Sequence, residues 1–299
     1  MGTIVSIEVI EPADPALANE LDATIDRAFE WFHDVERHCS RFDQHGELRV
    51  LTRQAGTAVA VSELVYTATH FALTVAEDTD GAFDPTVGLE MEARGFDRHY
   101  LTGERNRTPI SARQDGQRPT YRDVILDPSA RTITLRTPLL LDLGAVAKGL
   151  AIDLAARELA PFEHFAIDAG GDLYVAGLNA QHQPWSVGIR HPRRDRDVIE
   201  RLTLSNCAIC TSGDYERTGP AGHHILDARD GREAATLASA TVVAPTAMAA
   251  DALATAAFVL GPADGLALLE RHGVDGLLIS PALERFSTRG LSAAILPHA

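Results

Sequence analysis

The sequence predicts an α+β fold in which a mixed, largely antiparallel sheet forms the core and helices flank it. Helical periodicity is concentrated in the first hundred residues and around residues 246–272, whereas the middle of the chain contains mainly short runs with strand-like alternation. Strands and helices segregated along a chain favour an α+β fold over a doubly wound sheet. With 299 residues, 45% of them hydrophobic, the chain can bury a full core as one large domain or two modest ones.

The acidic composition limits the classes of partner. The formal net charge is -15 and the sequence pI is near 5.2. Nucleic acids and anionic membranes bind basic faces, so we expect neither as a principal partner. A negatively charged ligand would have to be neutralised locally, by a metal, by a few cationic side chains or by backbone amides.

Neither export nor membrane insertion is expected from the chain as written. The N-terminus lacks a basic region followed by an apolar run, and no apolar run approaches the length of about 18 residues that a spanning helix needs. Cys39, Cys207 and Cys210 are too few and scattered for a disulfide framework, which fits a reducing compartment. Because residues three apart on a strand point to opposite faces, Cys207 and Cys210 do not predict redox or zinc chemistry. We expect a soluble, cytoplasmic protein.

The first 135 residues predict alternating helices and short strands. Residues 3–10 alternate as a strand, and residues 16–39 carry apolar side chains at the three- and four-residue spacing of an amphipathic helix. A polar loop follows at residues 40–43. Further predicted elements are a short helix at 47–53, a strand at 57–61, a helix from 62 to about 80, an exposed loop at 97–120, and strands at 123–126 and 132–135.

A phosphate-binding arrangement is suggested by residues 139–149. An apolar strand is predicted to end in a small-residue turn and to lead into a helix, through about residue 160, with Lys148 in its first turn. Free amides and the helix dipole attract an anion there, and a lysine adds positive charge. The pattern matches neither the G-x-x-x-x-G-K-[ST] loop nor G-x-G-x-x-G, so its specificity is modest.

Strands dominate the next hundred residues. Runs at 165–168 and 173–176 flank a Gly-Gly turn typical of a hairpin, and runs at 185–189 and 198–204 are expected to add to the sheet. Residues 211–217 are predicted to form a polar loop. The histidines and the aspartate of the following segment, residues 223–227, suggest acid-base chemistry; a neutral histidine bonded within a strand pair is the alternative.

An alanine-rich helix at residues 246–260, stopped by Gly261 and Pro262, carries Asp251 and Thr255 four residues apart. At that spacing both oxygens stand on one helical face, where they suit a hard cation such as Mg²⁺. In the alternative, Asp251 only complements the helix dipole and Thr255 bonds back to a carbonyl. A last helix at 264–272 and a hairpin at 276–280 and 285–288 complete the chain.

With these segments in order, the sequence resembles the FAD:protein FMN transferases, the ApbE-like flavin transferase family. The resemblance covers nearly the whole chain, and eight motifs occur in the family's order. They are Met1-Gly2-Thr3, Ser40-Arg41-Phe42, the run from Gly81 to Gly88, the run from Leu141 to Gly149, Ala169-Gly170-Gly171-Asp172, Thr211-Ser212-Gly213-Asp214-Tyr215, His224-Ile225-Leu226-Asp227 and the run from Ala250 to Ala256.

The resemblance implies a T-fold-related flavin transferase domain over residues 1–299, which could form two lobes with FAD bound between them. It also implies a Mg²⁺-dependent reaction, with Mn²⁺ as an alternative. The FMN half of FAD is transferred to a Thr or Ser hydroxyl of an acceptor protein through a phosphoester bond, and AMP is released. The partners implied are therefore FAD and an acceptor protein with a Thr or Ser flavinylation site.

Site residues are implied position by position. The metal is expected at the carbonyl oxygen of Ala145, at Asp251 and at Thr255. The flavin nucleotide is expected at Met1, Phe42, Ala82, Phe83, Asp84, Asp142, Lys148 and Ile225. For assistance in deprotonating the acceptor hydroxyl, the candidates are His224 and Asp227, with Asp214 behind them.

Two other functions remain open from the sequence. One is Mg²⁺-dependent hydrolysis of FAD to FMN and AMP, with water in place of the acceptor hydroxyl. The other is flavin binding without catalysis, which Asp251, Thr255 and Lys148 disfavour. Many family members begin with a lipoprotein signal, whereas this chain starts at the Met1-Gly2-Thr3 motif. It is therefore expected to be either a cytoplasmic member or a chain whose upstream segment is missing.

Overall fold

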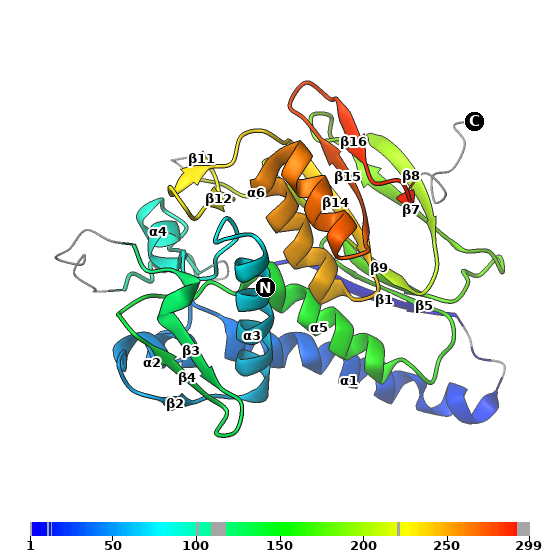
Figure 1. Cartoon of the computed structure of the whole chain (residues 1–299). Coiled ribbons are helices and arrows are strands. Elements are labelled where there is room, and N and C mark those ends of the chain that lie inside the picture. Colours follow the sequence, from blue (N-terminus) through cyan, green and yellow to red (C-terminus); the bar gives the residue numbers. More distant parts are fainter. Residues whose placement is uncertain are drawn as a thin grey trace.

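A seven-stranded sheet forms the centre of the computed structural model (Figure 1), which describes residues 2–10, 12, 14–99, 102–108, 118–219 and 222–291. All neighbouring strands of this sheet are antiparallel, in agreement with the predicted fold class. In spatial order the strands are β1 (Val5–Val9), β5 (Phe165–Ala169), β6 (Asp172–Ala176), β9 (Cys207–Gly213), β14 (Ser239–Ala244), β15 (Asp275–Ile279) and β16 (Arg285–Ser287).

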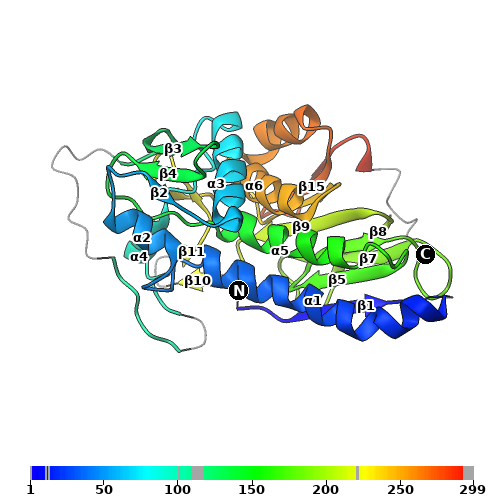
Figure 2. The same ribbon diagram turned by 90° about the horizontal axis from the view of Figure 1, so that it is seen from below.

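Three long helices cover one face of the sheet. These are α1 (Pro15–Cys39), α5 (Gly144–Glu158) and α6 (Ala247–Arg271). The helices α1 and α5 lie side by side (Figure 2), and α6 packs against α5 and over β9, β14 and β15. One apolar stripe of α1 is buried in this layer, because its apolar residues recur every three or four positions.

A hairpin covers the opposite face of the sheet. Its strands, β7 (Trp185–Arg190) and β8 (Val198–Leu204), pair only with each other among the described residues, so the prediction that they extend the central sheet was wrong. Alternation identifies the buried face of a strand but not the sheet it joins. The side chains on the buried face of the hairpin, such as Leu202 and Ile189, pack against Ile209 and Leu277. These two residues belong to the central sheet and lie on its face opposite the helices.

A smaller lobe lies beside the helical layer, at the lower left of Figure 1. A three-stranded sheet, in the order β2-β4-β3, is its framework. The elements of this lobe are α2 (Glu47–Arg53), β2 (Val59–Ala60), α3 (Glu63–Asp78), α4 (Gly88–Ala93), the short 3-10 helix η1 (Tyr121–Asp123), β3 (Val124–Asp127) and β4 (Thr132–Leu135). Ser62 caps α3, because its hydroxyl accepts the Val65 N–H at 3.3 Å.

Two small hairpins connect β9 to β14. They consist of β10 (Thr218–Gly219) with β11 (Gly222–His223), and of β12 (Leu226–Asp227) with β13 (Arg232–Glu233). The predicted polar loop at 211–217 begins later than expected. Residues 211–213 belong to β9, where the Thr211 hydroxyl bonds Thr241 of the neighbouring strand at 2.9 Å. Polar residues with partners across a strand pair are compatible with a ladder.

Two other local predictions were wrong. Leu140 is fully buried, but it forms only an isolated bridge with Val87, so the apolar run before α5 is buried coil rather than a strand. The segment at 97–120 is not uniformly exposed. Asp97 has no exposed surface, and its carboxylate accepts Arg107 Nε at 2.8 Å; residues 109–117 lie outside the described residues. Burial of this charge depends on an ion pair that hydropathy does not reveal.

The predicted helix stop at Gly261 is confirmed as a kink. Helical hydrogen bonding resumes after it, but Gly261 has φ 80° and ψ −173°, so α6 consists of two helical pieces. Among the described residues, α6 is the one helix long and apolar enough to cross a membrane, and 61% of its most apolar window is buried inside the fold. Its length and hydropathy therefore match its position in the core.

Candidate functional site

A cavity of about 530 Å³ lies where the helical layer meets the smaller lobe. Its lining comes from the loop after α1, the segment after α4, the N-terminal halves of α5 and α6, the end of β9, and the loop from β11 to β12. Ten residues predicted for the site line it: Phe42, Phe83, Asp84, Asp142, Ala145, Lys148, His224, Ile225, Asp251 and Thr255. Segments more than 200 residues apart in the chain thus contribute to one cavity.

Three predicted residues stand apart. Ala82 is fully buried behind the cavity, where its carbonyl accepts the Ala228 N–H at 3.2 Å. Asp227 is not in the described lining, and Met1 lies outside the described residues. The contacts of these three residues with a nucleotide or a substrate remain predictions.

The cavity floor, defined as Ala145, Lys148, Ser212, Asp251 and Thr255, is built by two helix starts and one strand end. The first amides of α6 are held by the Asp153 carboxylate of α5, which accepts the N–H groups of Ala247 and Met248 at 2.7 and 3.0 Å. Thr246 adds a side-chain cap. Capping from a neighbouring helix fixes where α6 begins and therefore where Asp251 stands.

Gly149 permits the two helices to approach closely. A Cβ on this residue would lie 2.4 Å from the Ala247 carbonyl oxygen, and no side chain fits there. At this crossing the Gly149 N–H donates to Asp251 Oδ2 at 3.3 Å. The absence of a side chain at position 149 is thus what brings Asp251 against the backbone of α5.

Lys148 lies between two carboxylates. Its Nζ forms an ion pair with Asp172 and lies 3.4 Å from Asp251 Oδ2. The lysine is the fifth residue of α5, so it stands beyond the first turn in which the sequence placed it. Its ammonium group neutralises part of the negative charge of the floor, and its described ion pairs do not include Asp142.

The oxygen groups of the floor suit a hard cation. Asp251 Oδ1 has no hydrogen bond within the described residues, and the Thr255 hydroxyl lies 2.9 Å from Ser212 Oγ rather than bonding back to a helix carbonyl. Asp251, Thr255 and Ala145 line the same cavity. The described residues contain no group of three His, Cys, Asp or Glu side chains that could hold a metal ion, so the candidate ligands here are one carboxylate and neutral oxygens. One carboxylate with neutral oxygens fits Mg²⁺ or Mn²⁺, which bind oxygen ligands and keep positions for phosphate or water.

The cavity wall, defined as Arg41, Phe42, Phe96 and Asp142, is built from loops. Asp142 accepts Arg41 Nε at 2.7 Å and the Gly144 N–H at 2.9 Å. Burial alone would raise the pKa of Asp142, but the Arg41 charge and these hydrogen bonds hold it below its usual range. Asp142 is therefore a carboxylate at neutral pH, with its orientation fixed.

Asp84 organises its own loop. Its two oxygens accept the N–H and hydroxyl of Thr86 at 2.9 and 2.8 Å and the Tyr121 N–H at 2.8 Å. Burial raises the pKa of this carboxyl, and the hydrogen bonds partly oppose the shift. With 7% of its surface exposed, Asp84 borders the cavity but its oxygens are committed to the backbone.

His224 has one ring nitrogen available. Its Nδ1 lies 3.3 Å from the Arg217 carbonyl oxygen, which can only accept, so Nδ1 carries the proton and the lone pair is on Nε2. Burial, followed by the charge of Arg217, lowers the pKa of His224 to about 4. At neutral pH the ring is thus uncharged and can accept a proton through Nε2.

The other acid-base candidates are bound by arginines. Asp227 is held by Arg229, with Nη2 2.7 Å from Oδ2, and Asp214 is bidentate with Arg193 at 2.7 and 2.6 Å.

His223 donates from Nε2 to the Ala234 carbonyl at 2.9 Å and accepts the Ile225 N–H at Nδ1. The bonded-histidine alternative therefore describes His223, whereas His224 faces the cavity.

A comparison with protein-family models identifies the family of the chain. The model of the ApbE family matches residues 1–278. This chain belongs to the ApbE family. The resemblance inferred from the motifs is therefore confirmed.

Curated relatives and solved structures extend this similarity over nearly the full chain. An FAD:protein FMN transferase of Treponema pallidum is 32% identical, covering 94% of this chain and 83% of the relative. A Vibrio cholerae enzyme of the same name is 30% identical, covering 93% and 85%. The crystal structure of a Thermotoga maritima ApbE protein has a TM-score of 0.82 at 30% identity over 99% of this chain and 95% of that one. The flavin transferase ApbE from Vibrio cholerae has a TM-score of 0.81 at 27% identity, with 98% and 96% covered.

Two cavity residues of this ApbE-family chain had no role in the sequence interpretation. Arg41 was part of a motif, but its contact with Asp142, 101 residues away, has no local signal. Glu216 follows the Thr211–Tyr215 motif, lines the cavity and is solvent-accessible. Desolvation raises the pKa of Glu216 to about 7, against the opposing charges of Lys148 and Arg217. A glutamate within a polar loop gives no sequence sign of such a shift.

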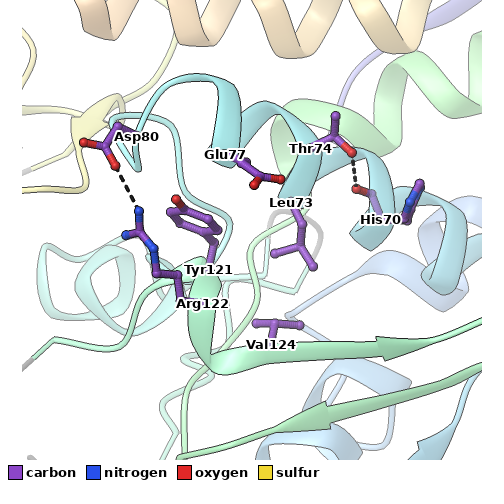
Figure 3. Close-up of a pocket in the computed structure, with 8 residues that line it drawn as sticks. All are labelled: His70, Leu73, Thr74, Glu77, Asp80, Tyr121, Arg122 and Val124. Carbon is purple, nitrogen blue, oxygen red and sulfur yellow. Dashed lines mark hydrogen bonds and ion pairs between the residues drawn. The ribbon is translucent and has the colours of Figure 1, made fainter.

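A second depression, of about 490 Å³, lies between α3 and the η1–β3 segment (Figure 3). It contains no residue predicted for the site. Two polar pairs in it are bonded, with Arg122 Nη2 3.0 Å from Asp80 Oδ1 and the Thr74 hydroxyl donating to the His70 carbonyl at 3.1 Å. The residues predicted for the site therefore gather in the first cavity and not in this depression.

Proposed function

We propose that this chain transfers the FMN half of FAD to a Thr or Ser hydroxyl of an acceptor protein and releases AMP. The observation that carries the proposal is the convergence of ten residues, chosen from the sequence for flavin nucleotide, metal and proton transfer, on one cavity. The names of the curated relatives, FAD:protein FMN transferase, support the same reaction. FAD would lie between the helical layer and the smaller lobe, whose residues line opposite sides of the cavity.

The floor is the proposed position of the pyrophosphate. Ala145, through its carbonyl oxygen, Asp251 and Thr255 would hold Mg²⁺ or Mn²⁺, which supplies charge neutralisation to the phosphate oxygens. Lys148 adds a fixed positive charge 3.4 Å from Asp251. In a protein of net charge -15, these local charges offset the repulsion of an anionic substrate.

His224 is the proposed proton acceptor. The acceptor hydroxyl oxygen attacks the phosphorus of the FMN phosphate, the bond from this phosphorus to the bridging oxygen breaks, and AMP leaves with that oxygen. The hydroxyl proton moves to Nε2, since Nδ1 is occupied by the Arg217 carbonyl. With a pKa of about 4, His224 is a weak base, so its removal should lower kcat by about a hundredfold, the low end for general-base catalysis.

The decisive experiment combines the protein, FAD and Mg²⁺ with candidate acceptor domains from the same organism and measures intact masses. A gain of the FMN mass minus water on the acceptor, matched by an equal amount of AMP, supports the transfer. Steady AMP release without an adduct would instead support FAD hydrolysis. FAD binding without AMP would support a non-catalytic flavin protein.

The same assay tests the proton acceptor. The His224→Ala variant should retain its affinity for FAD and lose turnover. A kcat within twofold of the wild type, at unchanged pH dependence, would remove His224 from the mechanism while leaving the transfer itself intact.

A further inference from the structure

Arg41 is a buried arginine in the loop between α1 and α2. It is 5% exposed, although the surrounding residues 40–46 form turns rather than regular structure. Burial of a guanidinium is unfavourable unless its charge and N–H groups are matched. The partners of Arg41 therefore show what its position achieves.

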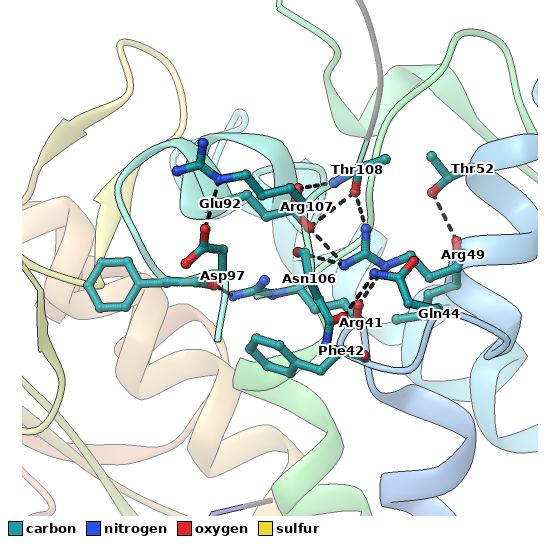
Figure 4. Close-up of polar contacts among 12 residues, drawn as sticks. Arg41, Phe42, Gln44, Arg49, Thr52, Glu92, Asp97, Asn106, Arg107 and Thr108 are labelled. Atoms are coloured by element: carbon teal, nitrogen blue, oxygen red, sulfur yellow. Dashed lines mark hydrogen bonds and ion pairs between the residues drawn. The ribbon is translucent and has the colours of Figure 1, made fainter. Parts of the chain in front are cut away.

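The guanidinium joins three parts of the cavity wall. Its Nε donates to Asp142 Oδ2 at 2.7 Å, and its Nη2 donates to the Phe96 carbonyl at 2.7 Å. Its central carbon lies 4.2 Å from the centroid of the Phe42 ring. Figure 4 shows Arg41 next to Phe42. Asp142 precedes α5 and Phe96 follows α4, so one side chain links two segments that share no backbone ladder in the described part of the chain.

The loop backbone is held by other residues. Arg49 Nε donates to the Arg41 carbonyl at 2.7 Å, and Asn106 Nδ2 donates to the Phe42 carbonyl at 2.7 Å. Arg49 is itself fixed by Glu92 at 2.8 Å. The path of the loop therefore does not depend on the Arg41 guanidinium, whose contacts orient Asp142, Phe96 and Phe42 instead.

One nitrogen of Arg41 has no partner among the described residues. Nη1 is buried and makes no hydrogen bond to the described residues. An unsatisfied buried donor opposes folding, so a residue selected only for stability would not retain it. The unsatisfied donor lies at the edge of the cavity. This indicates that the arginine at position 41 serves the geometry of the wall rather than the stability of the loop.

We propose that Arg41 is a positioning residue that preorganises the cavity wall for the flavin half of FAD. It holds Asp142 ionised and oriented, and it fixes Phe96 and Phe42 in one arrangement before the ligand binds. Preorganisation of this kind increases affinity, because the ligand does not have to order the wall on binding. The inference rests on the proposed function, since FAD is its ligand.

The test measures FAD affinity and thermal stability for the wild type, Arg41→Met, Arg41→Lys and a matched control. Titration of flavin fluorescence in Mg²⁺ gives Kd without turnover. Arg41→Met should raise Kd about tenfold to a hundredfold, as for the loss of a hydrogen bond to a charged group. Arg41→Lys keeps the charge but lacks the planar guanidinium fork that donates to Asp142 and to the Phe96 carbonyl at once, so its Kd should be intermediate.

Arg285→Met is the control. Arg285 pairs with Glu200 at 2.9 Å and does not line the cavity. This variant should lower Tm while leaving Kd within twofold. If Arg41→Met fails to fold, Arg41→Lys carries the comparison. A Kd equal to that of the wild type in the folded Arg41 variant would overturn the inference.

A double-mutant cycle with Asp142→Asn separates positioning from general damage. If Arg41 acts through Asp142, the Kd of the double variant for FAD should about equal the higher of the two single-variant Kd values. The reason is that each single variant already removes the same Arg41–Asp142 interaction. If the fold-increases in Kd of the two single variants multiply in the double variant, Arg41 does not act through Asp142. A wild-type protein that does not bind FAD would contradict the proposed function itself, whereas normal binding by both wild type and Arg41 variants contradicts only the role of Arg41.

Discussion

The floor and the wall of the cavity face the same space but are positioned by different means. Asp251 and Thr255 stand on α6, Ala145 and Lys148 stand on α5, and the contact of these helices is set by backbone at Gly149. The wall is carried by the loop after α1 and the segment after α4, where arginine side chains replace a backbone ladder.

This difference separates two requirements of the proposed reaction. Groups that act on phosphates must be held within a fraction of an ångström, which regular elements achieve best. A surface for a planar ring can be assembled from loops, provided that side-chain contacts order them. The floor should therefore be sensitive to small changes in backbone packing, and the wall to the removal of single charges.

The largest effect is expected from Asp251→Asn. The amide keeps the shape of the side chain but removes the only carboxylate proposed as a metal ligand, so AMP release at saturating FAD should fall about a thousandfold, or about 4 kcal/mol. Asp195→Asn is the control, since Arg190 binds that carboxylate and Asp195 does not line the cavity. Equal losses in the two variants would contradict the assignment of the floor.

The wall scaffold should respond next, through Arg49→Met. This arginine is 2% exposed and pairs with Glu92, and its loss leaves a buried carboxylate. We expect the free energy of unfolding to fall by about 3 kcal/mol, the lower end for a broken buried pair, because Thr108 still donates to Glu92. In urea denaturation, Arg49→Met with Glu92→Met should recover most of this loss. If the double variant instead loses the sum of the two single-variant losses in free energy of unfolding, the unpaired Glu92 carboxylate is not the cause of the loss.

Gly149→Ala tests the packing of the floor. The new methyl group would meet the Ala247 backbone at 2.4 Å, so the helices must separate, at about 2 kcal/mol of stability. Gly46→Ala, in the wall loop, would meet Asp43 at 3.2 Å and should change stability by less than about 1 kcal/mol. A Tm for Gly149→Ala equal to that of the wild type would mean that α5 and α6 are not in tight contact.

The smallest effect is expected from a pH dependence at Glu216, because this side chain is solvent-exposed and water screens its interactions. Desolvation raises its pKa from 4.5 in the unfolded chain to about 7 in the folded protein, so the folded state binds more protons between these values. The contribution of Glu216 to stability therefore decreases as pH rises from about 4.5 to 7. In metal-free protein, Glu216→Gln should gain Tm relative to the wild type from pH 5 to pH 8. A Tm difference between Glu216→Gln and the wild type that stays the same from pH 5 to pH 8 would show that the pKa of Glu216 is not raised.

Local patterns predicted most elements, because periodicity, caps and turn residues act over a few positions. The amphipathic helix at 16–39 and the Gly170-Gly171 hairpin are examples. Placement of β7 and β8 was wrong, since alternation does not specify the partner sheet. In the site, the Asp251–Thr255 face follows from helical spacing, but the Arg41–Asp142 pair and the Gly149 crossing depend on tertiary contacts that leave no local trace.

The place of α6 in the chain sets when the cavity can exist. The wall is complete in sequence by Asp142, whereas the floor also requires Ser212 and the residues of α6 up to Thr255. During synthesis from the N-terminus, the early half must wait for these later segments before the sheet and the helical layer can close. A nascent chain therefore has no assembled floor until most of it has left the ribosome, so incomplete chains would lack the proposed metal and phosphate site.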